Sequence, residues 1–323
     1  MLPDEYVALI KQALTVTGHY ASNTKEAYTD LTERYRNSNA SGFNSKAEMA
    51  AYIEARFPAT FSVVAHILGA EITADTPIQS TLDLGAGPGT ATLAAINHFP
   101  ILYATLVEQT PEFMSAAKVV LTPTYPSTSF TYSCESVHNA NFPKVDLVLL
   151  SYLLTEMHER QALRLYESSL NATKIFNLVI LPGTPAAFKL LLQLRDQAIA
   201  LGYTIVAPCP HGMICPMTQQ TDQWCHFRQR LSRSRAHQAI KKGSLGYEDE
   251  PYCYLLVTPG KSDHAADKNV ITENRIINTP RHRPGHIYVD VCTKSGARET
   301  QCVTKKDKSV FKTAKDLKWG DRI

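Results

Sequence analysis

Three cysteines and two histidines lie close together in the second half of the chain: Cys209, His211, Cys215, Cys225 and His226. Thiolate and imidazole groups are the ligands that zinc and iron centres use in proteins. Prolines directly follow Cys209 and Cys215. They stiffen the backbone and remove amide donors, as also happens around iron–sulfur ligands. The stretch therefore predicts a metal centre.

Three interpretations of these thiols stay open on spacing alone. The separations are wider than the C-x-x-C pairs of zinc ribbons, which counts against an ordinary zinc site. An iron–sulfur cluster needs a fourth thiolate, which Cys253, Cys292 or Cys302 could supply. A zinc ion could instead recruit one of the histidines, and the remaining interpretation is a set of reduced cysteines without metal. Cys134 lies in a predicted sheet region and is expected to be a small buried side chain.

A run of positive charge follows the cysteines directly. It consists of Arg228, Arg230, Arg233, Arg235, Lys241 and Lys242, with no acidic residue between positions 228 and 242. Spaced on a helix, several of these side chains would point the same way, toward RNA phosphates. The alternative is a solvated basic helix.

A glycine-rich stretch, Leu-Asp-Leu-Gly-Ala-Gly-Pro-Gly-Thr at residues 82–90, stands between a predicted strand and a predicted helix. Gly85 can adopt the positive φ of a sharp turn, Gly87 lets a ligand approach the backbone, and Gly89 begins a helix whose amides face the ligand. Asp83 can accept a hydrogen bond from an ammonium group of that ligand. The stretch predicts a nucleotide-like cofactor site.

Glu108 ends the next predicted strand, where an acidic side chain binds the two hydroxyls of a ribose. Because Thr90 replaces the third glycine of the dinucleotide pattern, the loop has the G-x-G-x-G form, which resembles class I S-adenosylmethionine-dependent methyltransferases. An ordinary glycine-rich turn is the alternative. No general acid or base is evident. Glu156 and His158 lie just beyond the strand predicted at 145–150, and neither is assigned a role.

The elements that would position these residues alternate along the chain. Short apolar runs predict strands at residues 81–84, 102–107, 145–150, 176–181 and 203–206. Amphipathic runs predict helices at residues 92–98, 111–121, 160–170 and 186–201. This order implies an α/β fold with a parallel sheet covered on both faces.

Four regions are expected along the chain. They are an N-terminal helical region (1–72), a cofactor-binding core (73–207), a cysteine-rich and basic region that completes the sheet (208–260) and a basic β-rich tail (261–323). In the first region a loop at 37–42 and Pro58 are expected to separate helices, and a polar linker is expected at 260–279. Short tail strands are predicted at 285–291, 300–305 and 310–314.

Composition is that of an ordinary globular protein, with 44% of the 323 residues hydrophobic and 20% charged. The net charge of +3 hides an asymmetry: residues 261–323 hold 14 Lys and Arg against 8 Asp and Glu, and residues 1–260 hold 19 against 22. Basic ends often contact phosphate. No run reaches the ~18 apolar residues of a membrane span, and the acidic start differs from a presequence. A cytoplasmic location without membrane contact is therefore expected, and the seven cysteines indicate a reducing compartment.

Several of these motifs together resemble one known family. They are Arg-Phe-Pro-Ala-Thr-Phe at 56–61, the glycine loop, Pro-Gly-Thr-Pro at 182–185, the cysteine stretch with its basic sequel, Gly-Tyr-Glu-Asp-Glu at 246–250 and Trp-Gly-Asp at 319–321. From about residue 50 to the end, the chain resembles the methyltransferase-like proteins associated with the mitochondrial small ribosomal subunit and their bacterial relatives. The cysteine stretch with its Tyr-Glu-Asp-Glu sequel is the most specific part of this resemblance.

The resemblance implies a class I methyltransferase (Rossmann-like) fold with two bound groups. One is S-adenosylmethionine, held by Asp83, Gly85, Gly87, Gly89 and Glu108. The other is a [4Fe–4S] cluster, with zinc less favoured, whose ligands carried over by motif would be Cys209, Cys215, Cys225 and Cys292, with Cys253 a spectator. Relatives often have Glu where this chain has Leu181, and this departure favours a non-catalytic role.

The resemblance also implies partners, namely the rRNA and proteins of the small ribosomal subunit during assembly or translation, bound by a monomeric chain. The first hypothesis is an S-adenosylmethionine-binding, methyltransferase-like protein of that subunit, whose turnover is open. An active rRNA methyltransferase is the alternative, and a small-molecule methyltransferase is the third hypothesis. Methyl transfer depends mainly on in-line positioning, so a missing acid–base pair does not exclude catalysis.

Overall fold

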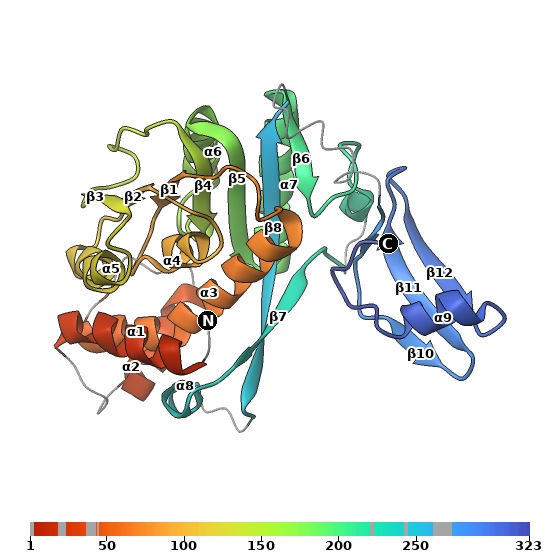
Figure 1. Cartoon of the computed structure of the whole chain (residues 1–323), viewed down its shortest axis with the longest axis horizontal. Coiled ribbons are helices and arrows are strands. Elements are labelled where there is room, and N and C mark those ends of the chain that lie inside the picture. Colours follow the sequence, from red (N-terminus) through yellow and green to blue (C-terminus); the bar gives the residue numbers. More distant parts are fainter. Residues whose placement is uncertain are drawn as a thin grey trace. The chain divides into compact units, whose positions relative to one another are not determined.

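The computed structural model describes residues 3–18, 24–36, 43, 45–219, 223–241, 245–260 and 273–323. The chain divides into two compact units, one formed by Met1–Met157 and Gln229–Glu250 and the other by His158–Arg228 and Pro251–Ile323. Figure 1 shows their elements. The predicted loop at 37–42 and residues 261–272 of the predicted linker lie outside the described residues. The four expected regions stay a prediction.

The first unit holds N-terminal helices and a sheet with its covering helices. The helices are α1 (Pro3–Leu14), α2 (Thr24–Arg36), α3 (Lys46–Glu71), α4 (Thr90–Ile96), α5 (Pro111–Thr124) and α8 (Arg235–Ile240), with 3-10 turns η1 (Thr15–Thr17) and η2 (Leu154–Glu156). The strands are β1 (Ser80–Leu84), β2 (Tyr103–Val107), β3 (Ser129–Ser133) and β4 (Val145–Ser151). Two further strands, β7 (Phe227–Ser232) and β8 (Tyr247–Pro259), have residues in both units.

Parallel pairing orders the strands of the first unit β3-β2-β1-β4. Leu82 of β1 lies between Thr105 of β2 and Val148 of β4. β1 and β4 are buried along most of their length, as strands of a sheet covered on both faces must be. The strands predicted at 81–84, 102–107 and 145–150 are confirmed. β3 is not predicted, because its residues are only half-buried or exposed and form no apolar run.

Helix α3 has 26 residues and continues through Pro58, so the break predicted at this proline is wrong. Ser45 caps the helix, because its hydroxyl accepts a hydrogen bond of 3.2 Å from the backbone N–H of Glu48. Burial of Phe57 and Phe61 on either side of the proline compensates for the hydrogen bond that proline removes from a helix interior. α3 contacts α2, α4 and α8, so it connects the helices of this unit.

The second unit holds the remaining elements. Its helices are α6 (Glu159–Asn171), α7 (Pro185–Ala200) and α9 (Lys308–Ala314), with the 3-10 turn η3 (Pro216–Gln219). Its strands are β5 (Thr173–Pro182), β6 (Tyr203–Ala207), β9 (Arg275–Ile276), β10 (Arg281–Arg283), β11 (His286–Cys292) and β12 (Arg298–Thr304).

Strand β8 lies between β5 and β6 and is antiparallel to both. The prediction of a purely parallel sheet is therefore wrong, because β5, β8 and β6 add antiparallel pairs. The sequence analysis misses β8 as a strand, although Tyr252–Val257 is buried, because the cysteines and charges around it dominate the pattern. The architecture is an α/β, Rossmann-like fold with a mixed sheet.

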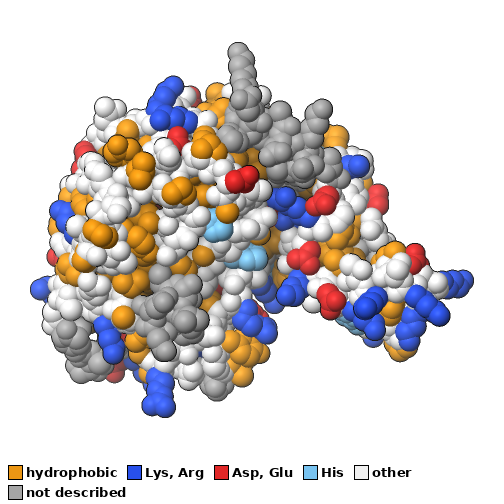
Figure 2. All heavy atoms as spheres, in the orientation of Figure 1, with side chains coloured by type: hydrophobic (Ala, Val, Ile, Leu, Met, Phe, Trp, Pro, Cys, Tyr) orange, Lys and Arg blue, Asp and Glu red, His pale blue; other side chains and the backbone are white. Residues whose placement is uncertain are grey.

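The C-terminal sheet has the strand order β10-β11-β12, with β9 paired to β11. Helix α9 covers one face, where Phe311 and Ala314 pack in one cluster with Ile287, Val289 and Val291. The strand predicted at 310–314 is wrong, because Asp307 caps a helix there by accepting a hydrogen bond of 3.1 Å from the N–H of Val310. In Figure 2, Lys and Arg side chains gather over the part of the chain that holds α9.

None of the helices in the described ranges is long and apolar enough to cross a bilayer. The expected cellular location stays a prediction.

Candidate cofactor pocket and cysteine cavity

The glycine loop between β1 and α4 is fixed by backbone hydrogen bonds. The N–H groups of Gly85 and Ala86 both donate to the carbonyl of Val107, at 2.9 and 3.1 Å. Gly89 has a φ of +77°, and a Cβ there would lie 2.8 Å from Leu121 Cδ1, so its role is packing as well as turning. Gly87 has a φ of +53°, and a Cβ there would meet nothing within 4 Å. The side of the loop at Gly87 is therefore open toward a ligand.

The carboxylate of Glu108 is held by the backbone of both neighbouring loops. It accepts hydrogen bonds from the N–H of Gly87 at 2.9 Å and from the N–H of Thr110 at 2.8 Å. A carboxylate has about four acceptor positions. The two remaining positions on this carboxylate could accept from the hydroxyls of a ribose.

The carboxylate of Asp83 is buried and only half satisfied. One oxygen, Oδ2, accepts from the N–H and the hydroxyl of Thr92, at 3.1 and 2.8 Å. The other oxygen, Oδ1, is buried and has no hydrogen-bond partner among the described residues. Burial raises the pKa of Asp83 to about 6. A cationic donor at Oδ1 would satisfy this group and favour its charged form.

A cavity of about 340 Å³ opens beside these residues in the first unit, a size typical of small-molecule sites. Its lining includes Gly85, Gly87, Glu108, Ser151 and Glu156, together with the rings of Phe43, Tyr52 and Phe113. The three rings contact one another, with centroids 4.8–5.4 Å apart. The sequence analysis missed these rings, because aromatic residues in a helical region ordinarily indicate a core.

Glu156 also faces this cavity. Burial, and then the negative charge of Glu108, raise the pKa of Glu156 to about 7. The sequence analysis gave Glu156 no role, because nothing in the local pattern distinguishes it from a surface glutamate of the following helix.

A smaller cavity of about 30 Å³ also borders the glycine loop and is lined by Asp83, Arg56 and Ser151 among others. Arg56 of α3 donates a hydrogen bond of 2.7 Å to Glu250, and its guanidinium carbon lies 4.8 Å from the centroid of the Tyr152 ring. Tyr152 directly follows β4 and has a φ of +64°, a strained conformation for a residue with a side chain. The Arg56–Glu250 pair thus supports the turn that follows β4.

The basic run does not form one helix, so that prediction is wrong. Residues 227–232 form β7, and only residues 235–240 form α8. Arg228 and Arg235 are exposed, and the guanidinium carbon of Arg228 lies 5.0 Å from the centroid of the Trp319 ring. Lys242 lies outside the described residues.

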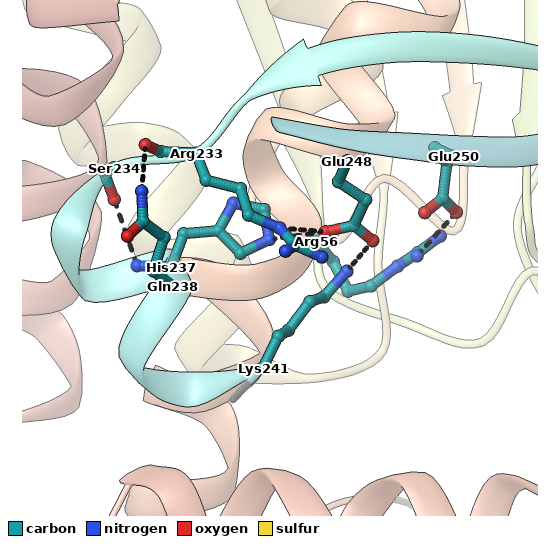
Figure 3. Close-up of polar contacts among 8 residues, drawn as sticks. All are labelled: Arg56, Arg233, Ser234, His237, Gln238, Lys241, Glu248 and Glu250. Atoms are coloured by element: carbon teal, nitrogen blue, oxygen red, sulfur yellow. Dashed lines mark hydrogen bonds and ion pairs between the residues drawn. The ribbon is translucent and has the colours of Figure 1, made fainter. Parts of the chain in front are cut away.

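Three other cations of the run have acidic partners that follow it in sequence. Arg230 donates to both carboxylate oxygens of Asp249, at 2.7 and 2.8 Å. Arg233 donates to Glu248 at 3.1 Å, and Lys241 pairs with the same carboxylate. Figure 3 shows the side chains of Arg233, Lys241 and His237 around Glu248, with Arg56 paired to Glu250 nearby. These cations hold the protein together and are less available to RNA than their sequence suggests.

The four predicted cluster cysteines line one cavity in the second unit: Cys209, Cys215, Cys225 and Cys292. Burial, and then the neighbouring thiols of Cys209 and Cys215, raise the pKa of Cys225 well above its ordinary value. The same causes raise the pKa of Cys292 to about 12. Thiols that raise one another's pKa are close in space, and a bound cation would favour their thiolate forms.

Buried polar groups hold the loop that carries these cysteines. Arg195 of α7 donates to the carbonyls of His211 and Met213, at 2.9 and 2.6 Å. Arg275 of β9 donates to the carbonyl of Pro208 at 3.0 Å. The Nε2 atom of His211 lies 3.4 Å from the sulfur of Cys292. Within the described residues, no three His, Cys, Asp or Glu side chains meet closely enough to hold a single metal ion.

The remaining cysteines differ in their surroundings. Cys253 lines the same cavity, and its thiol donates to the carbonyl of Pro182 at 3.2 Å. Cys134 and Cys302 are exposed. The expectation that Cys134 is buried is therefore wrong, because it follows β3, whose residues are only partly covered.

Comparison with known proteins gives relatives of much greater length. The Rsm22-cox11 tandem protein 2, mitochondrial, of Schizosaccharomyces pombe is 27% identical over 292 residues, covering 75% of this chain and 38% of the relative. The ribosome assembly protein RSM22, mitochondrial, of Saccharomyces cerevisiae is 24% identical over 175 residues, covering 36% of this chain and 28% of the relative. This chain thus spans well under half the length of these relatives.

Among solved structures, the magnesium protoporphyrin IX methyltransferase of Synechocystis PCC 6803 aligns with 72% of this chain and 95% of its own, at 11% identity and a TM-score of 0.42. The family described as mitochondrial small ribosomal subunit Rsm22 matches residues 46–323. That match includes the glycine loop, the cysteine cavity and the C-terminal sheet. The chain therefore belongs to the family of the mitochondrial small ribosomal subunit protein Rsm22.

Proposed function

We propose that this protein binds S-adenosylmethionine in the pocket beside the glycine loop and acts at the small ribosomal subunit during assembly or translation. The observation that carries the first part is the unpartnered Oδ1 of buried Asp83. Asp83 lines the cavity of about 30 Å³, and Glu108 lines the cavity of about 340 Å³ that shares Gly85 and Gly87 with it. The second part is supported by membership of the Rsm22 family and by a relative named a ribosome assembly protein.

The residues around the pocket suit the parts of S-adenosylmethionine. Asp83 would accept from the ammonium group, and Glu108, already fixed by the N–H of Gly87, would accept from the ribose hydroxyls. Arg56 and Asp83 line the same small cavity and carry opposite charges, as the zwitterionic end of the cofactor requires. Gly85 and Gly89 shape the loop, and Gly87 leaves room for the ligand.

Replacing Gly87 by Asn tests cofactor binding with little effect on the fold. Asn tolerates left-handed φ better than most residues, and the space at Gly87 is open, so the added side chain would block only a ligand. We expect affinity for S-adenosylmethionine, measured by isothermal titration calorimetry, to fall about ten-fold or more, in line with ~1.4 kcal/mol per ten-fold.

Gly202 supplies the matched control. It has a φ of +84° with nothing within 4 Å of an added Cβ, and it does not line the pocket. Gly202→Asn should leave the affinity unchanged. Equal weakening by both substitutions would contradict the proposed pocket. Co-sedimentation of Gly87→Asn with small ribosomal subunits then shows whether subunit binding depends on the cofactor.

We also propose that the cysteine cavity holds a [4Fe–4S] cluster bound by Cys209, Cys215, Cys225 and Cys292. The cavity lining supports this, because the four thiols face one space. A cluster holds its thiolates farther apart than a zinc ion does, since each thiolate binds a different iron. When bound, the cluster would fasten β11 to the loop that follows β6.

Replacing Cys225 by Ser is expected to remove the visible absorbance and at least half of the bound iron from anaerobically purified protein. The physical reason is that a hydroxyl is a much poorer ligand for iron than a thiolate. Cys134→Ser is the matched control, because Cys134 is exposed and away from the cavity. Zinc in place of iron in the wild-type protein, measured by elemental analysis, would overturn the cluster.

The proposed RNA contacts are Arg228, Arg230, Arg233, Arg235, Lys241 and Lys242. Exposed Arg228 and Arg235 are the better supported members, because Arg233 and Lys241 are engaged by Glu248. Arg230 is 64% exposed, so it could exchange its surface ion pair with Asp249 for a phosphate at small cost.

Methylation of rRNA is the second candidate function, and one observation favours it. Glu156 faces the pocket, and its pKa of about 7 suits a group that takes a proton from an attacking amino nitrogen as the methyl group leaves the sulfonium. A methylation map of small-subunit rRNA with and without the protein decides between the candidates. Loss of one specific methyl group would establish the enzyme.

A further inference from the structure

One face of the C-terminal sheet is left uncovered by α9. Ile287, Val289 and Val291 of β11 point into the core beneath α9, so the alternating residues His286, Tyr288 and Asp290 point to the opposite face. Directly paired residues of antiparallel strands share a face. The register therefore places further side chains on that face: Arg281 and Cys302 beside Tyr288, and Arg283 and Thr304 beside His286.

Two rings on this face have nearly the same orientation. The centroids of His286 and Tyr288 are 6.3 Å apart, and the ring planes differ by 19°. The Nδ1 atom of His286 lies 3.2 Å from the carbonyl of Pro284, which limits rotation of the imidazole. His286 is exposed and Tyr288 is half-buried. Bases stacked on such rings would also share one orientation, as successive bases of a single strand do.

Positive charge borders the two rings. Arg283 is exposed and lies opposite His286, and exposed Arg281 lies opposite Tyr288. Asp290 is the acidic residue of this face, and it is neutralised by Arg281 and accepts a further hydrogen bond from Thr300 at 2.7 Å. The exposed end of the face is therefore cationic and aromatic.

We propose that this face, the C-terminal platform of Arg281, Arg283, His286 and Tyr288, binds a single-stranded segment of RNA. Stacking on His286 and Tyr288 would hold the bases, and Arg283 would contact a phosphate. Single-stranded RNA fits better than a duplex, because rings on a sheet face can stack only on bases that are already unpaired. The inference rests on the proposed function at the small ribosomal subunit and names the contact surface.

Binding of a labelled, unstructured RNA oligonucleotide to the full-length protein, measured by fluorescence anisotropy over a series of salt concentrations, tests this platform. Tyr288→Ala is expected to weaken binding about ten-fold with an unchanged salt slope, because it removes stacking and no charge. Tyr288→Phe should bind within about two-fold of the wild type, since the ring remains. Arg283→Ala should weaken binding and lower the salt slope by about one.

Lys312 of α9 provides the control, because it is exposed on the helix that covers the other face of the sheet. Lys312→Ala should change the affinity less than about two-fold. Equal binding by wild type, Tyr288→Ala and Arg283→Ala would overturn the platform, as would preference for a duplex of the same sequence. Co-sedimentation of the wild type with small subunits is a separate readout. If the wild type co-sediments while the platform variants bind RNA normally, only the platform is overturned. If the wild type does not co-sediment, the proposed function itself is overturned.

Discussion

Replacing Glu250 by Gln is expected to lower the free energy of unfolding by about 3 kcal/mol, because it leaves the largely buried Arg56 guanidinium without a counter-charge. The pair is 2.7 Å apart, and the side chains of Arg56 and Glu250 are only 22% and 8% exposed. Urea denaturation followed by circular dichroism measures the change. We also expect weaker S-adenosylmethionine binding, since Arg56 lines the small cavity and packs on Tyr152.

The neighbouring residue of the same strand is the matched control for this prediction. Asp249 pairs with Arg230, whose side chain is 64% exposed, so Asp249→Asn should cost less than about 1 kcal/mol. If the two variants lose equal stability, burial of Arg56 is not the source of the effect. The comparison thus separates a pair that supports the fold from a pair that lies in solvent.

The glycine loop and its two carboxylates could be predicted from the sequence because their signal is local. A buried strand, a turn with three glycines and the start of a helix follow one another within residues 80–96. Glu108 lies at the end of the next strand, and parallel pairing of β1 with β2 brings it to the loop. Each step uses only the order of neighbouring elements.

The other walls of the pocket could not be predicted in the same way. Tyr52 and Arg56 come from α3, and Phe113 comes from α5, so their meeting depends on how helices pack against the sheet. Helix packing is set by side chains that are distant in sequence. In the sequence alone, an aromatic residue on a helix indicates a core and gives no sign of a ligand.

The basic run was misjudged because its acidic partners lie just beyond it. Between residues 228 and 242 the chain has no acidic residue, but β7 pairs with β8 and brings Arg230 next to Asp249 and Arg233 next to Glu248. An antiparallel pairing of this kind joins charges that a linear window separates. The cysteines are distant in sequence but are expected to meet: Cys292 lines the same cavity as Cys209 and Cys215, although 77 positions separate Cys215 from Cys292.

Replacing Asp83 by Asn is expected to make the ligand-free protein more stable and to weaken cofactor binding strongly. The Asn oxygen can accept from Thr92 as Oδ2 does at 2.8 Å, so the fold is kept, and the buried charge is removed. Loss of that charge should weaken S-adenosylmethionine binding by about a hundred-fold or more, because the ammonium group would lose its buried counter-ion. Calorimetry of binding and urea denaturation measure the two effects on the same preparation.

The gain in stability must depend on pH, and its sign follows from the two pKa values. Aspartate ordinarily titrates at 3.8, whereas burial raises the pKa of Asp83 to about 6 in the folded protein. Below pH 3.8 both states are protonated, and Asn has no advantage. As the pH rises toward 6, Asp83 ionises in the unfolded chain but stays largely protonated in the folded protein. The free energy of unfolding of the wild type therefore falls, by at most about 3 kcal/mol.

Asp146→Asn is the control, because the Asp146 carboxylate is satisfied by hydrogen bonds within the protein whereas that of Asp83 is only half satisfied. Asp146 Oδ2 accepts from the N–H groups of Gln79 and Ser80 and from the Ser80 hydroxyl, at 3.0, 2.9 and 2.8 Å. Asn keeps one acceptor oxygen but loses the charge that strengthens these three hydrogen bonds. Replacing Asp146 should therefore lower stability at neutral pH, where Asp83→Asn raises it. Saturating S-adenosylmethionine should stabilise the wild type and leave Asp83→Asn unchanged. A loss of stability in Asp83→Asn at pH 8 would show that the carboxylate supports the fold, and the half-satisfied oxygen would then have no need of a ligand.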